Sequence, residues 1–142
     1  MIIPDVNIWI PALRSDLSDH ERYRDWLSAA IDAAEPLGIS ELVLSGVVRI
    51  LTNSQIFQKP SSATDVLAAL DSIQSAPGTR PVRPGEHHWS IFADLCVATA
   101  AKANLVADAY HAALAIEHDA IFITNDRDFG AFRGLSVRPP FA

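Results

Sequence analysis

The sequence predicts an α/β fold, a three-layer α/β/α sandwich in which helices cover both faces of a central, mostly parallel sheet. Short apolar, β-branched runs alternate along the chain with longer segments whose apolar residues recur at helical spacing. The strand-like runs carry few polar residues, which is typical of strands buried between two layers of helices. The 142 residues suit one domain spanning positions 1–142, large enough for a sheet with two covering layers.

The N-terminal half is expected to hold two strands and four helices. The expected elements are a strand at residues 1–5, helices at 6–13, 18–34, 41–52 and 63–75, and a short extended segment at 36–39. Asp5 ends the first strand and is also suited to cap the helix that follows. Ser40 is expected to cap the third helix, and Glu41 is the only acid in that largely apolar segment. Its place in the first turn also suits the helix dipole, so the position has a purely structural explanation as well.

The C-terminal half is expected to alternate strands and helices in the same way. The expected elements are an edge strand at 79–84, helices at 86–102 and from 105 onward, a strand at 120–124, a turn at 125–128, a short helix at 129–132 and a strand at 135–138. The prolines of the 79–84 segment favour an edge position. Trp89 and Leu95 are expected on the inner side of the 86–102 helix, and Asp108 in the first turn of the next one.

The composition narrows the class of protein. A hydrophobic content of 49% with 20% charged residues is that of an ordinary globular domain. No apolar run reaches the roughly 20 residues of a membrane span, so no membrane partner is expected. The first residues lack the features of a signal peptide, and Cys96 is the single cysteine. We therefore expect a cytoplasmic protein without disulfides.

The charge balance speaks against a broad basic surface for nucleic acid. Eleven Lys and Arg residues stand against seventeen Asp and Glu residues, which gives a net charge of −6. A nuclease remains compatible with this balance, because a cluster of carboxylates is itself negative until a metal ion binds to it.

Four acids occupy equivalent places in the predicted fold. Asp5 and Asp126 end apolar strands, and Glu41 and Asp108 open apolar helices. In open α/β sheets the carboxyl ends of the strands form the ligand-binding edge, so these side chains are expected to meet there. Carboxylates in one crevice repel each other unless they are protonated or neutralised. An oxygen-only ligand set selects Mg²⁺ or Mn²⁺ as the neutralising ion.

The chain resembles the PIN-domain ribonucleases of the VapC toxin type. The matching segments, in order, are I-I-P-D-V-N, S-E-L-V-L-S-G-V-V-R-I, V-A-D-A-Y-H-A-A-L-A-I-E-H and I-T-N-D-R-D-F, and the likeness extends over essentially residues 1 to 140. The resemblance implies a PIN-like fold and a metal-dependent endoribonuclease that acts as the toxin of a toxin–antitoxin pair, inhibiting translation and growth. It also implies a cognate antitoxin protein, an RNA substrate and a homodimer.

The same resemblance assigns the acids. It implies a catalytic set consisting of Asp5, Glu41, Asp108 and Asp126, and an Mg²⁺ (or Mn²⁺) site formed by Asp5, Asp108, Asp126 and Asp128. Four further residues are candidates for orienting these carboxylates or contacting substrate: Asn7, Arg49, Thr124 and Asn125. Each of the four is equally suited to a turn, a cap or a structural ion pair. No histidine is assigned to catalysis, and no Cys/His spacing indicates zinc.

Two other functions fit parts of the pattern. A phosphatase or receiver-like phosphoryl-transfer domain also uses an Asp after the first strand, but usually with a lysine near a later strand. The only lysines, Lys59 and Lys102, fall in a predicted loop and at a helix end. A non-catalytic PIN-like module that binds a protein partner is expected to have lost site acids, and none is lost here. The enzyme is therefore the preferred interpretation.

Overall fold

The sheet of the computed structural model, which describes residues 1–142, has five strands in the order β3-β2-β1-β4-β5. The strands are β1 (Ile2–Pro4), β2 (Leu37–Ser40), β3 (Thr79–Val82), β4 (Ile121–Ile123) and β5 (Ser136–Arg138). All four neighbouring pairs are parallel. The predicted α/β/α sandwich is confirmed, and the sheet is parallel throughout rather than mostly so. As the prolines of the 79–84 segment predict, β3 lies at one edge.

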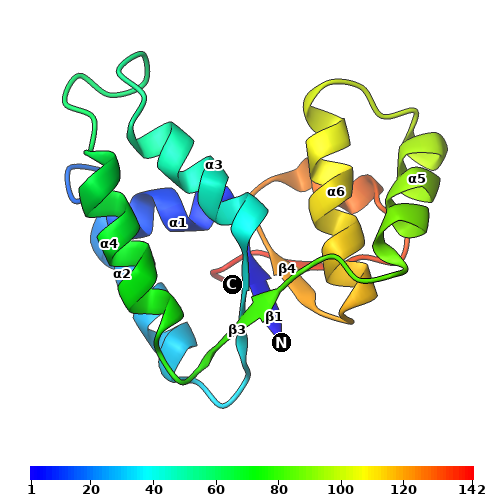
Figure 1. Ribbon diagram of the computed structural model, residues 1–142, viewed down its shortest axis with the longest axis horizontal. Helices are drawn as coiled ribbons and strands as arrows, with labels where there is room; N and C mark the ends of the chain where they lie inside the picture. The colour runs from blue at the N-terminus through cyan, green and yellow to red at the C-terminus, as the bar shows by residue number, and fades with distance from the viewer.

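Helices cover both faces of this sheet. They are α1 (Val6–Leu13), α2 (His20–Asp32), α3 (Glu41–Leu51), α4 (Ala63–Gln74), α5 (His88–Thr99), α6 (Asn104–Glu117) and the short 3₁₀ helix η1 (Arg127–Ala131). Figure 1 shows α1 to α4 on one side of the strands and the α5–α6 pair on the other. None of these helices has both the length and the apolar character needed to cross a membrane.

Successive side chains of the short strands point to opposite faces of the sheet, so the hydrophobic core has two halves. Ile2 and Ile123 pack with buried residues of α1 to α4. Their neighbours Ile3 and Phe122 point the other way and pack with buried residues of α5 and α6. Trp9 of α1 is 1% exposed and its indole N–H donates to the Pro4 carbonyl at 3.3 Å, so α1 is fixed directly against the end of β1.

Several predicted boundaries move by a few residues, and each shift has a local cause. The strand predicted at 79–84 ends at Val82, and α5 begins only at His88, because the segment between them is held by side chains of α6. Asp108 was expected in a first turn, but α6 begins at Asn104, which places Asp108 one turn further along. The predicted helix at 129–132 is η1, which starts earlier because the Asp126 carboxylate accepts a hydrogen bond from the Asp128 N–H.

Candidate active site

The strand register brings Asp5 and Thr124 together at one edge of the sheet. Pro4 of β1 pairs with Ile123 of β4, so Asp5 and Thr124 follow side by side where these strands end. The two side chains are in direct contact, since the Thr124 hydroxyl donates to Asp5 Oδ2 at 2.7 Å. The crevice beyond the carboxyl ends of parallel strands is the usual ligand site of such folds.

Asp5 is both a helix cap and the best-oriented carboxylate of this edge. Its side chain is buried, with 8% of the residue exposed. Oδ1 accepts from the Val6 N–H at 2.7 Å, which caps α1. Oδ2 accepts from the Thr124 hydroxyl and, at 3.1 Å, from the Asn7 side-chain amide. The capping explanation and the site explanation therefore use different oxygens of the same carboxylate.

The polar candidates around Asp5 form one network between two turns. Thr124 Oγ1 accepts from the Asp126 N–H and from the Asn7 amide, both at 3.0 Å. Asn7 Oδ1 accepts in turn from the Asn125 N–H at 3.3 Å. These bonds tie the β1–α1 turn to the β4–η1 turn and fix the backbone that carries Asp5 and Asp126.

Burial and neighbouring carboxylates raise the pKa values of Asp5 and Asp108 at this edge. Burial, together with the charges of Asp126, Asp5 and Asp128, raises the pKa of Asp108 to about 6. Burial also raises the pKa of Asp5, although the hydrogen bonds from Thr124 and Val6 oppose this shift. The structure thus places Asp5, Asp108, Asp126 and Asp128 within one shared electrostatic field.

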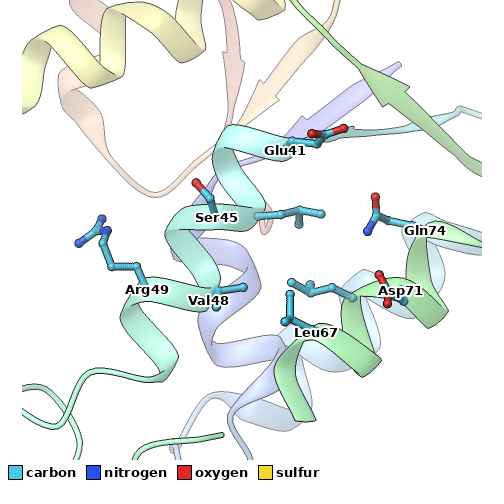
Figure 2. Close-up of a pocket in the computed structure, with 9 residues that line it drawn as sticks. Glu41, Ser45, Val48, Arg49, Leu67, Asp71 and Gln74 are labelled. Atoms are coloured by element: carbon cyan, nitrogen blue, oxygen red, sulfur yellow. The ribbon is translucent and has the colours of Figure 1, made fainter. Parts of the chain in front are cut away.

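Glu41 and Arg49 lie apart from that field. The Glu41 side chain is 70% exposed, and its Oε1 accepts from Arg83 Nη2 at 3.0 Å and from Arg83 Nε at 3.3 Å. Figure 2 shows Glu41 at the start of α3 and Arg49 two turns further on, pointing in different directions. Both line a largely apolar groove of about 530 Å³ between α3 and α4, where Leu67 contributes an exposed side chain.

The four aspartates at this edge have the oxygen donors that a hard divalent cation prefers, but their side chains do not yet surround one position. No three Asp, Glu, His or Cys side chains stand close enough together to hold one ion as they lie. The donors that share the field are all carboxylate oxygens. Their repulsion adds to burial in raising the pKa of Asp108, and a bound cation relieves that repulsion. Mg²⁺ and Mn²⁺ are the ions that such a donor set selects.

Two residues near this edge, Arg83 and Arg138, were not singled out by the sequence. Arg83 follows β3, and Arg138 ends β5 and lines a groove of about 440 Å³ together with Asp126 and Arg127. Both could have been found from their position at the end of a predicted parallel strand. His111 lies one turn after Asp108, and burial lowers its pKa, so its imidazole is held neutral. Its buried Nδ1 has no hydrogen-bond partner.

Replacing Asp108 by Asn is expected to stabilise the metal-free protein. The pKa of an Asp in an unfolded chain is about 3.9, and in the fold that of Asp108 is raised to about 6. The Asp108 carboxyl therefore stabilises the fold most when it is protonated, below pH 4, and this stabilisation is lost as the pH rises through 6. After discounting for solvent screening at this partly exposed site, Asp108→Asn should gain about 1 kcal/mol at pH 7.

Urea unfolding in EDTA at pH 7 and pH 5 checks this expectation. The gain of the variant over the wild type should shrink at pH 5, where the wild-type carboxyl is largely protonated. A variant less stable than the wild type at both pH values contradicts the assignment of repulsion at this site.

Comparison with known proteins agrees with the fold. Residues 2–135 match the PIN domain family. Ribonuclease VapC43 of Mycobacterium tuberculosis is 40% identical over 140 residues, covering 99% of this chain and 95% of that protein. Ribonuclease VapC25 of the same organism is 33% identical, covering 99% of both chains.

Solved structures share the architecture. FitAcB from Neisseria gonorrhoeae superposes with a TM-score of 0.69 at 25% identity, covering 99% of each chain. VapBC2 from Rickettsia felis, solved with a DNA fragment from its promoter, gives a TM-score of 0.71 at 17% identity, covering 98% of each chain, and supports the fold alone. With a PIN domain across nearly its full length and VapC ribonucleases at up to 40% identity, the chain belongs to the PIN-domain family of VapC ribonucleases.

Proposed function

We propose that this protein is a divalent-metal-dependent endoribonuclease, the toxin of a toxin–antitoxin pair, whose metal ligands are Asp5, Asp108 and Asp126. The observation that carries this assignment is that burial and the charges of three neighbouring carboxylates at the carboxyl edge of the sheet together raise the pKa of Asp108 to about 6. Asp128 belongs to the same field and is the further candidate ligand. Membership of the VapC ribonucleases supports RNA hydrolysis as the reaction.

The chain's own residues prepare the site for a metal ion. Thr124 and Asn7 hold Asp5 Oδ2 in place, so one ligand is oriented before any ion arrives. When bound, Mg²⁺ or Mn²⁺ lowers the pKa of a water molecule and neutralises charge on the phosphodiester. The neutral imidazole of His111 lies on the same helix as Asp108 without adding positive charge that would compete with the ion.

Positive side chains beside the carboxylates support an RNA path. Arg127 and Arg138 line the groove next to Asp126, where β4 and β5 end. Arginine is the preferred bidentate ligand for phosphate. We assign this groove to the RNA backbone on one side of the scissile bond, which gives an acidic protein a local basic surface where it needs one.

Removing one of these arginines is expected to weaken RNA binding without removing the metal site. In a background inactivated by Asp108→Asn, Arg138→Gln should lower the slope of log affinity against log salt by about 1. Arg133→Gln is the matched control, because Arg133 is exposed nearby but does not line the groove. Fluorescence anisotropy with an RNA oligonucleotide measures both. Equal slopes for the wild type, Arg138→Gln and Arg133→Gln would exclude the groove as the phosphate path.

Partner proteins complete the proposal. The resemblance to VapC toxins, with membership of the VapC ribonucleases, supports a cognate antitoxin for this chain as well. Expression of the toxin alone is expected to arrest growth, and co-expression with its cognate antitoxin to relieve it. We also propose a homodimer, which light scattering of the purified protein tests directly.

Cleavage of total cellular RNA by the purified protein tests the reaction itself. With Mg²⁺ or Mn²⁺ we expect discrete fragments whose ends identify the target, and with EDTA we expect none. Intact RNA under every metal condition would instead favour a PIN-like module that binds a protein partner.

A further inference from the structure

An ion pair joins the ends of two neighbouring strands beside the proposed site. Ser40 of β2 pairs in register with Val82 of β3, so the next residues, Glu41 and Arg83, stand opposite each other. Two donors of the Arg83 guanidinium bind the same Glu41 oxygen, Nη2 at 3.0 Å and Nε at 3.3 Å. The side chains are 70% and 66% exposed, so the pair forms at the surface and is open to exchange.

The backbone of Arg83 is held in place by the end of α6. The His118 imidazole Nε2 is 2.7 Å from the Arg83 carbonyl oxygen and donates to it. Glu117, with only 9% of its side chain exposed, accepts from the N–H groups of Gly85 at 2.7 Å and His87 at 3.0 Å. The Glu-His pair that closes this helix therefore fixes the segment between β3 and α5, and with it the position from which Arg83 reaches Glu41.

Glu41 has a second set of neighbours on its other side. β2 lies between β3 and β1, and β1 ends at Asp5. Adjacent strands are about 4.8 Å apart. The Glu41 side chain is 70% exposed, which leaves room for a change of rotamer toward the β1 side. In this structure the charges acting on Asp108 are those of Asp126, Asp5 and Asp128, so the Glu41 carboxylate stands outside the cluster.

We propose that Arg83 is a positioning residue that holds Glu41 away from the carboxylate cluster and competes with the metal ion for it. This inference rests on the proposed function, because it takes the metal to bind at that cluster. An exposed ion pair is weak, so a divalent ion can displace Arg83 and recruit Glu41 as an additional oxygen ligand. In this structure Glu41 is paired with Arg83.

A double-mutant cycle read out by Mn²⁺ affinity tests this role. Isothermal titration at low salt compares the wild type with Arg83→Gln, Glu41→Gln and the double variant. Arg83→Gln should bind Mn²⁺ about three-fold more tightly, the gain expected from releasing an exposed ion pair. In the Glu41→Gln background the same substitution should leave the affinity unchanged. Arg80→Gln is the control, because it removes an equal charge from β3, the strand that Arg83 follows, at an exposed residue whose side chain donates only to carbonyl oxygens.

The outcomes separate this inference from the proposed function. If Arg83→Gln tightens binding equally with and without Glu41, its effect is general electrostatics and the competition is excluded. The same conclusion follows if Arg83→Gln behaves like Arg80→Gln. A wild type that binds no Mn²⁺ at all contradicts the proposed function, and the positioning role fails together with it.

Discussion

Asp5→Asn is expected to lose more than about 100-fold in RNA cleavage, beyond the 10- to 100-fold typical of residues that only support a metal ligand. Asparagine keeps an oxygen that can accept the Val6 N–H and so preserves the cap of α1. It removes the charge of a buried carboxylate whose pKa is already raised by burial. The variant should therefore keep its fold, although its amide nitrogen replaces the Oδ2 that accepts from Thr124 and Asn7.

The control for this variant is Asp94→Asn on the exposed side of α5, which removes one negative charge that is not among those acting on Asp108. It should cleave RNA at the wild-type rate. Full activity of Asp5→Asn, with its fold verified by circular dichroism, would remove Asp5 from the site. Equal losses in both variants would indicate an effect of net charge rather than of a metal ligand.

Trp9→Ala is expected to be the most destabilising single change near the site, at a cost of about 3–5 kcal/mol in the free energy of unfolding. Trp9 is 1% exposed and bonds to the carbonyl of Pro4, so its loss leaves a cavity and an unpaired acceptor where β1 meets α1. A typical domain has a total stability of about 5–15 kcal/mol, which makes this a large share.

Trp89→Ala is the matched comparison, because Trp89 is 71% exposed on α5. Its effect on the free energy of unfolding should stay within about 0.5 kcal/mol, as for most surface substitutions. Urea unfolding of the two variants measures the difference. Similar losses from both would mean that α1 is not packed against β1 as described.

Sequence reasoning succeeded where the signal is local. Apolar runs with polar ends marked the strands, and this was enough to place Asp5 and Asp126 at the same edge of the sheet. The apolar character of residues 41–52 also predicted the helix that Glu41 opens, with Ser40 as its cap. The cap is confirmed, because the Val43 N–H donates to the Ser40 hydroxyl. These features follow from burial and capping within a few residues of each other.

Sequence reasoning failed where the orientation of a side chain depends on residues far away along the chain. The orientation of Glu41 is set by Arg83, 42 residues away, and that pairing follows from the register of β2 and β3 rather than from any local pattern. Trp89 was expected inside and lies outside, because the inward face of α5 is occupied by residues such as Leu95 that pack with α6. Helical spacing alone does not decide which apolar face a neighbouring helix covers.

The central claim is that the carboxylates at the end of β1, on α6 and after β4 hold a divalent metal ion. Crystals soaked in Mn²⁺, with anomalous diffraction data, test this claim most directly. We predict an anomalous peak in contact with Asp5, Asp108 and Asp126, with the Glu41 side chain turned away from Arg83 and toward the ion. Well-ordered crystals with no peak among these three residues, or with Mn²⁺ bound only elsewhere, would contradict the account.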